Sequence, residues 1–88
     1  MKVYRSILIV DDSATSRMII QRCLEMAGIR AASYTAAENG LDALAKLKDG
    51  GSFDLVVTDL NMPKMDGRAF VRIVKDDPGY APVPLVVV

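Results

Sequence analysis

The sequence predicts an α/β domain in which parallel strands form one sheet with helices on both of its faces. Short aliphatic runs such as Ile7–Val10, which acidic residues follow, are typical of parallel strands that are buried on both sides. Segments with apolar residues at helical spacing lie between these runs, and short connections join them. The resulting order β-α-β-α-β-α-β implies right-handed crossovers and therefore a parallel sheet.

Four strands are predicted. Ile7–Val10 and Phe53–Thr58 contain aliphatic runs and are followed by acidic residues, so we expect both strands to be buried. Arg30–Thr35 mixes small and polar residues, which is typical of a strand at the edge of a sheet. Leu85–Val88, which Pro84 introduces, is aliphatic throughout and indicates a central strand covered on both faces, although the chain ends there.

Three helices are predicted between the strands. Ser13 is the predicted N-cap of the first helix, and Gly28 supplies a left-handed C-terminal cap. The apolar face of this helix comprises Ile20, Cys23, Leu24 and Ala27, so we expect Cys23 to lie in the core. The second helix ends at Gly50-Gly51, and its apolar face comprises Gly40, Ala43, Leu44 and Leu47. Asp66 caps the third helix, which Pro78 terminates and whose apolar face comprises Phe70, Val71 and Val74.

The amino-acid composition and the net charge exclude several classes of function. A chain of 88 residues that is 51% hydrophobic and 25% charged is expected to form one small soluble domain. Eleven basic residues balance eleven acidic ones, so no excess positive charge attracts nucleic acid or a membrane surface. The absence of His excludes catalysis by a His base and zinc sites with His ligands. A single Cys and the lack of a long apolar run indicate a cytoplasmic protein.

Acidic residues follow two of the predicted buried strands. Asp11 and Asp12 come after the first of these strands, and Asp59 comes after the other. Ligands of open α/β sheets bind at the carboxyl ends of the strands, so neighbouring strands would bring the three carboxylates together. Such a cluster repels itself unless a cation lies within it, and oxygen ligands alone favour Mg²⁺. A helix cap or turn role is the alternative for Asp12 taken by itself.

The stretch Val56–Gly67, which reads VVTDLNMPKMDG, together with Ile7–Val10 and the following Asp11-Asp12-Ser13, resembles the receiver domain of bacterial two-component response regulators. Single-domain regulators of the chemotaxis type are the most similar. The resemblance runs from about Arg5 to Val88 and implies a flavodoxin-like, doubly wound parallel sheet with strand order 2-1-3-4-5. It further implies that residues 1–88 are one receiver domain truncated after the fourth strand, without the last helix, strand and helix.

The resemblance also implies roles for individual residues. Asp59 would be the phosphoacceptor, taking a phosphoryl group from a sensor histidine kinase, and no other catalytic residue is expected. Mg²⁺ would be the cofactor, bound by Asp11, Asp12, Asp59 and the backbone carbonyl of Asn61. The loop beside this site would be shaped by Pro63, Asp66 and Gly67. A chain of this kind is a signalling module and not an enzyme.

Two other functions compete with this one. Phosphatases of the haloacid dehalogenase type also place an Asp after a buried strand, but they need an acidic general acid two residues later, where this chain has Asn61. The chain could instead be a receiver-derived fragment or an engineered assembly module without signalling activity of its own. In the truncated chain we expect a homodimer, through the exposed fourth strand or through element exchange about a hinge in Pro78–Pro84.

Overall fold

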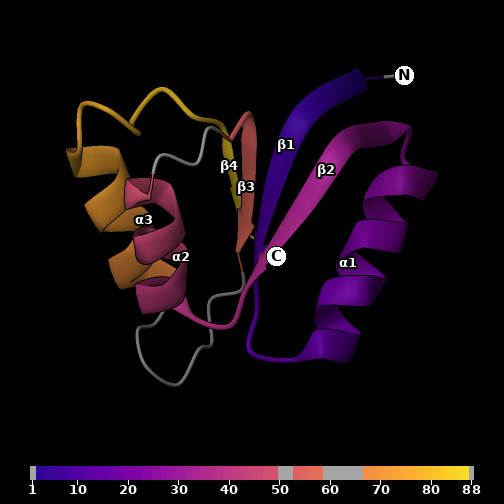
Figure 1. Cartoon of the computed structure of the whole chain (residues 1–88), viewed down its shortest axis with the longest axis horizontal. Coiled ribbons are helices and arrows are strands. Elements are labelled where there is room, and N and C mark those ends of the chain that lie inside the picture. The colour runs from indigo at the N-terminus through magenta and orange to yellow at the C-terminus, as the bar shows by residue number, and fades with distance from the viewer. Residues whose placement is uncertain (1, 50–52, 59–66, 88) are drawn as a thin grey trace.

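The computed structural model describes residues 2–49, 53–58 and 67–87, and its elements follow the predicted order. The elements are β1 (Lys2–Val10), α1 (Ala14–Met26), β2 (Ile29–Ala37), α2 (Gly40–Lys48), β3 (Leu55–Thr58), α3 (Gly67–Asp76) and β4 (Leu85–Val87). All pairs of neighbouring strands are parallel, and the order across the sheet is β2-β1-β3-β4. Figure 1 shows α1 on one face of the sheet and both α2 and α3 on the other. The predicted flavodoxin-like parallel sheet, with strand order 2-1-3-4 for its four described strands, is confirmed.

The first two strands are longer than the sequence predicted. β1 begins at Lys2 and not at Ile7, and β2 extends to Ala37. The two strands pair along their whole length, because backbone hydrogen bonding continues where the side chains are small or polar. β2 has only β1 as a partner in the described sheet, so its predicted edge position is confirmed.

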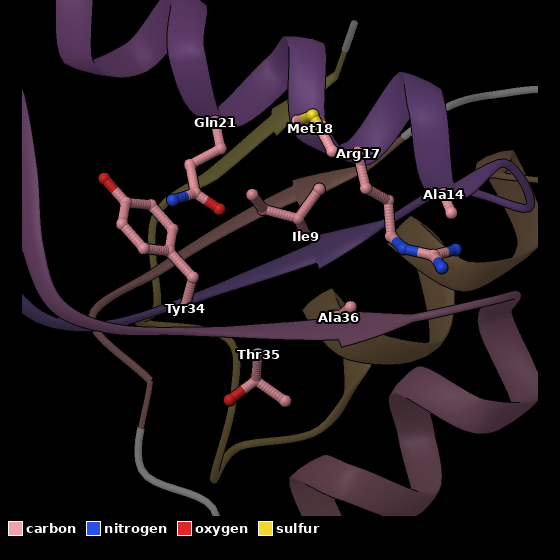
Figure 2. A pocket seen from close by; sticks show the side chains of 8 residues that line it. All are labelled: Ile9, Ala14, Arg17, Met18, Gln21, Tyr34, Thr35 and Ala36. Atoms are coloured by element: carbon pink, nitrogen blue, oxygen red, sulfur yellow. The ribbon is translucent and has the colours of Figure 1, made fainter.

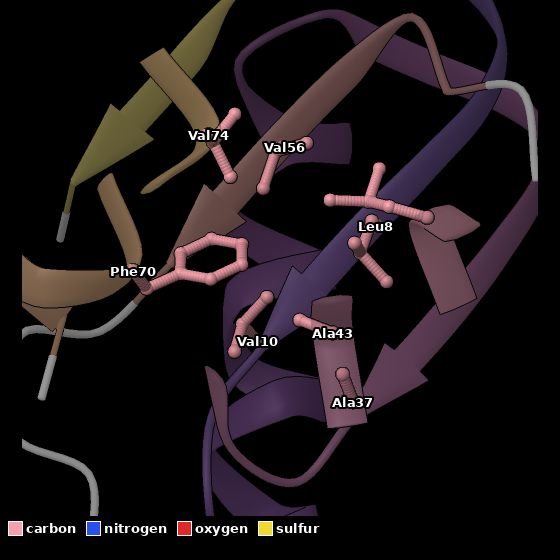
Figure 3. Packing of buried hydrophobic residues seen from close by; sticks show 8 residues of the cluster. Leu8, Val10, Ala37, Ala43, Val56, Phe70 and Val74 are labelled. Atoms are coloured by element: carbon pink, nitrogen blue, oxygen red, sulfur yellow. The ribbon is translucent and has the colours of Figure 1, made fainter. Parts of the chain in front are cut away.

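The face covered by α2 and α3 holds the larger core. Phe70 and Val74 lie one turn apart on α3 and are both fully buried, as the helical spacing predicted. They pack against alternate residues of β1 and β3 and against one face of α2 (Figure 3). The buried members of this cluster are Leu8, Val10, Ala37, Ala43, Leu47, Val56, Phe70 and Val74.

The face covered by α1 is less completely enclosed. Ile20 and Leu24 of α1 pack on the strand residues Ile7, Ile9, Leu55 and Val57, but α1 itself contains no buried residue. The placement of Cys23 in the core was wrong, because the structure leaves this side chain exposed. α1 lies mainly over β1 and β2, so the side of the helix that carries Cys23 borders an open groove toward β4.

The strand β4 is more exposed than the sequence predicted. Val86 and Val87 are 46% and 43% exposed, so the strand is not covered on both faces. β4 pairs with β3 alone among the described residues, which confirms the expectation, from the implied strand order, that this strand forms an edge. Leu85 packs against the core on the α3 side, whereas Val86 lines the open groove toward α1 and stays 46% exposed.

The helix ends and the last connection follow the local sequence signals. The Ser13 side chain accepts a hydrogen bond from the Ser16 amide at 3.3 Å, and Gly28 has a φ of 84°. The connection between α3 and β4 is hydrogen-bonded to α3. Lys75 Nζ donates to the carbonyl oxygens of Ala81 and Val83 at 3.1 and 3.0 Å. Any exchange of elements about this connection would first break these bonds. The predicted loop 60–65, the Asp66 cap and Gly50-Gly51 lie outside the described residues.

Candidate functional site

The carboxyl ends of β1 and β3 lie side by side. The two strands are neighbours, and their register pairs Val10 with Thr58. Asp11 leaves the sheet directly after Val10, while Asp59 follows Thr58 in the sequence and lies outside the described residues. The neighbour relationship on which the predicted site depends is therefore present in the sheet. The meeting of three carboxylates stays a prediction.

Asp11 is the anchored residue of the acidic pair. It is only 5% exposed, and its backbone amide donates to the Ala37 carbonyl oxygen at 3.0 Å. One carboxylate oxygen, Oδ1, accepts a hydrogen bond from the Ser13 amide at 3.0 Å. This geometry closes the turn from β1 into α1 and places the carboxylate at the start of the helix, where the helix dipole stabilises negative charge. Asp12, the next residue, is exposed.

Arg17 completes the turn, and the sequence analysis missed it. Its guanidinium Nη1 donates to the backbone carbonyl oxygen of Asp11 at 2.5 Å. Figure 2 shows the side chain extending from α1 toward the carboxyl end of β1. One sequence signal could have identified it: Arg17 lies close to the start of α1, where the helix dipole disfavours a cation, and the first turn holds no acidic residue.

A second set of hydrogen bonds organises the connection between β2 and α2. Asn39 caps α2 by accepting from the Asp42 amide at 2.8 Å, and Asp42 Oδ2 accepts from the Glu38 amide at 3.1 Å. The hydrogen bond from Glu38 is the main cause that lowers the pKa of Asp42, and the Lys46 ammonium at 3.3 Å lowers it further against a partial desolvation. Lys46 Nζ also donates to the Ala36 carbonyl oxygen, so the end of β2 is held from the α2 side.

Two shallow cavities flank α1. One, of about 250 Å³, lies between α1 and β2 and includes Arg17, Met18 and Tyr34 in its lining (Figure 2). The Tyr34 hydroxyl is buried and has no hydrogen-bond partner in the described chain. The other, of about 240 Å³, lies between α1 and β4 and is almost wholly apolar. Neither cavity has an Asp or Glu side chain in its lining, so the acidic edge is the better candidate for binding a cation.

The donor groups at this edge suit a hard cation. Within residues 2–49, 53–58 and 67–87, no three Asp, Glu, His or Cys side chains form a cluster that could hold a metal ion. Asp11 and Asp12 nevertheless supply adjacent carboxylates at one turn, and oxygen donors completed by water are the ligands that Mg²⁺ accepts. The remaining predicted ligands, Asp59 and Asn61, and the loop residues Pro63 and Asp66 lie outside the described residues. Gly67 is the first residue of α3.

Comparisons with known proteins all point to the same protein family. Residues 7–88 match the model of the response regulator receiver domain. The chain is 34% identical over 82 residues to the chemotaxis protein CheY1 of Helicobacter pylori, covering 93% of this chain and 64% of that protein. It is 40% identical over 83 residues to the sensor histidine kinase CheAY of the same species, covering 93% of this chain and 10% of that protein.

A solved structure supports the same assignment. The Mn²⁺-bound form of the response regulator Rcp1 superimposes with a TM-score of 0.80 at 31% identity, covering 94% of this chain and 63% of that one. The chain thus spans just under two thirds of CheY1 and of the Rcp1 chain, and a tenth of CheAY.

Proposed function

This chain belongs to the response regulator receiver domain family, and on that premise we propose that it is a signalling module that takes a phosphoryl group onto Asp59. The observation that carries the proposal is the register of β1 and β3, which pairs Val10 with Thr58. The strand ends that directly precede Asp11 and Asp59 in the sequence are therefore adjacent at one edge of the sheet. A buried carboxylate, that of Asp11, is already held there by the Ser13 amide.

The proposed reaction is a phosphoryl transfer from phosphohistidine. A carboxylate oxygen of Asp59 attacks the phosphorus atom while the bond from phosphorus to the imidazole nitrogen breaks. The imidazole keeps the electron pair of that bond and takes up a proton, and Asp59 becomes an acyl phosphate. Transfers of this type depend mainly on positioning and on stabilising the charge of the phosphoryl oxygens. A sensor histidine kinase is the proposed donor, and the similarity to CheAY, which is named as such a kinase, supports this pairing.

Mg²⁺ is the proposed cofactor. Asp11 and Asp12 would hold it together with Asp59 and the backbone carbonyl of Asn61, and Pro63, Asp66 and Gly67 would shape the neighbouring loop. When bound, the ion supplies positive charge that offsets the charge of the phosphoryl oxygens. The similarity to Rcp1, whose solved structure is an Mn²⁺-bound form, supports a divalent cation for this chain as well.

Mass spectrometry after treatment with acetyl phosphate tests the phosphoacceptor. With Mg²⁺ present, we expect one added phosphoryl group on the parent chain and none on Asp59→Asn. Asp54→Asn is the matched control, because Asp54 lies just before β3 and its carboxylate accepts from the Arg5 amide at 2.9 Å. This control should be labelled as fully as the parent. Labelling of Asp59→Asn, or no labelling of the parent, would contradict the proposal, and the second result would favour an inactive fragment.

Thermal unfolding tests the metal site independently of phosphorylation. Mg²⁺ should raise the melting temperature of the parent chain, because a ligand that binds only the folded state stabilises it. Asp59→Asn should melt higher than the parent in EDTA, because one of several like charges is removed. Its response to Mg²⁺ should be smaller. An unchanged melting temperature of the parent at saturating Mg²⁺ would count against the site.

Self-association along β4 is proposed as a separate property. β4 offers an uncharged edge in which Val86 and Val87 are almost half exposed, and an apolar groove adjoins it. Such edges pair readily with another chain, and a net charge of zero gives no long-range repulsion between copies. Sedimentation equilibrium should find a homodimer that Val86→Lys dissociates, whereas Ile73→Lys, on the opposite face, should leave it intact. A parent chain that sediments as a monomer would overturn this proposal.

No helix within the described chain has the length and apolar character needed to cross a membrane. The cytoplasmic location that the sequence indicated stays a prediction.

A further inference from the structure

Hydrogen bonds within the described residues hold Asp11 at its amide nitrogen, its Oδ1 and its carbonyl oxygen. Its amide donates to Ala37 in β2, and its Oδ1 accepts from the Ser13 amide, both at 3.0 Å. These two bonds fix the end of β1 and the Asp11 side chain. The third bond, from Arg17 Nη1 to the carbonyl oxygen of Asp11, acts on a different group, namely the peptide unit that joins Asp11 to Asp12.

The third bond matters most for Asp12. This residue is exposed, so packing does not determine the position of its carboxylate. The preceding peptide unit carries the Asp12 Cα atom, so holding that peptide narrows the range of positions that the carboxylate can adopt. Arg17 is a half-buried residue of α1, and its guanidinium is a planar, permanently charged donor. A hydrogen bond from a charged donor is stronger than one between neutral groups, so Arg17 is well suited to prevent rotation of this peptide.

We propose that Arg17 is a positioning residue for the metal-binding turn: by holding the peptide between Asp11 and Asp12 it raises the affinity of these carboxylates for a divalent cation. The inference rests on the proposed metal site and adds to it a residue from outside the ligand set. Groups that orient metal ligands without touching the metal commonly change metal affinity by about 10–100-fold.

The charge of Arg17 predicts the opposite effect, which makes the proposal testable. A fixed positive charge close to a cation site repels the cation, so removing it should tighten binding if charge were the whole contribution. If Arg17 acts by positioning, its removal weakens binding instead. The sign of the change therefore separates the two roles, and a general loss of stability can be measured separately.

The experiment measures Mn²⁺ binding by the loss of the free-ion EPR signal, using the unphosphorylated chain. Arg17→Met keeps the length of the side-chain stem and removes the donor, and we expect about tenfold weaker binding. Arg22→Met is the matched control, because Arg22 is an exposed arginine on the same helix. Its charge is screened, so its loss should change the affinity by less than about twofold. The ¹⁵N amide shifts of Asp12 and Ser13 should move in Arg17→Met and not in the control.

Each outcome decides the proposal. Binding by Arg17→Met that equals or exceeds that of the parent overturns it while leaving the metal site intact, whereas a parent that binds no Mn²⁺ removes both. If Arg17→Met loses the amide dispersion of a folded chain, Arg17→Gln decides, since its polar side chain is two bonds too short to reach the Asp11 carbonyl oxygen. Weaker Mn²⁺ binding by folded Arg17→Gln supports positioning, and unchanged or tighter binding overturns it.

Discussion

The two faces of the sheet are closed to different degrees. On one face, α2 and α3 contribute fully buried side chains, among them Ala43, Phe70 and Val74. On the other face, α1 contributes no buried residue, and Met18 and Ile19 are 62% and 57% exposed. Both faces of β3 and of the Ile7–Val10 part of β1 are nevertheless buried; Val56 and Val57, for example, face opposite sides and are 0% and 1% exposed.

The difference shows that one helix is enough to bury the central strands but not to bury itself. Two helices enclose each other's apolar sides as well as the sheet, and α2 and α3 are in contact with each other. α1 lies over β1 and β2 and has groove-like cavities on both of its flanks. We therefore expect the face of α2 and α3 to contribute most of the free energy of unfolding. Substitutions on the face of α1 should reduce this free energy less.

The largest expected effect is the loss of the Phe70 ring. Phe70→Ala should reduce the free energy of unfolding by about 3–5 kcal/mol, because the substitution leaves a cavity in the larger core. Leu24→Ala, on the half-buried face of α1, should cost less than about 2 kcal/mol, because less apolar surface is returned to water. Urea denaturation of both variants measures the comparison. Equal costs would show that α1 stabilises the fold as much as α3 does.

The helix caps provide the next comparison. Asn39→Ala removes the 2.8 Å hydrogen bond to the Asp42 amide at a buried position and should cost about 1–2 kcal/mol. Ser13→Ala removes a longer bond of 3.3 Å at a half-buried position, so its cost should lie near 0.5 kcal/mol on the ~0.5–2 kcal/mol scale of such caps. Both losses in the free energy of unfolding are measured from the shift of the denaturation midpoint, with the dependence of that free energy on denaturant concentration unchanged. A larger loss of stability for Ser13→Ala would contradict the expectation that the face of α2 and α3 contributes more to stability than the face of α1.

Gly28 tests the connection from α1 to β2. Its φ of 84° is unfavourable for residues with a Cβ atom, so Gly28→Ala should cost about 1 kcal/mol. A Cβ placed there would meet no atom within 4 Å, so the cost should arise from the backbone alone. Gly28→Asn should recover part of the loss, because Asn tolerates the left-handed conformation better than Ala. The thermal midpoints should rank parent, Asn variant, Ala variant; an Ala variant as stable as the parent would contradict the assigned strain.

The smallest expected effect is a pH dependence on the α2 side. The hydrogen bond from the Glu38 amide, with help from Lys46, lowers the pKa of Asp42 in the folded chain. The ionised carboxylate therefore stabilises the fold above its ordinary pKa of 3.8, and this contribution disappears as the pH falls through the lower folded value. Because Asp42 and Lys46 are about a third exposed, solvent screening keeps the contribution below about 1 kcal/mol.

Denaturation at several pH values checks this prediction. Asp42→Asn should be less stable than the parent at pH 7, and the difference should shrink below pH 3.8. Moderate salt should reduce the part that comes from Lys46 and leave the part that comes from the Glu38 amide. A difference that stays constant down to pH 2 would show that the charge of Asp42 does not matter for stability.

The sequence by itself determined the order of the elements, the parallel sheet and the apolar face of α3. These features depend on local periodicity, such as the spacing that places Phe70 and Val74 on one side of a helix, and on chemistry that is confined to one position, such as Gly28. The acidic residues after two buried strands were also visible, because Asp11 and Asp59 each directly follow a predicted buried strand.

Only the tertiary structure decided which of the apolar residues are covered. Helical spacing defines the apolar side of α1, but the exposure of Cys23 follows from where that helix crosses the sheet. Likewise, Val86 belongs to an aliphatic run that is typical of a buried strand, yet it is 46% exposed beside the groove between α1 and β4. The bond from Arg17 to Asp11 depends on the path of the turn between β1 and α1. Burial and long-range hydrogen bonds are set by neighbours distant in the sequence, which local patterns do not encode.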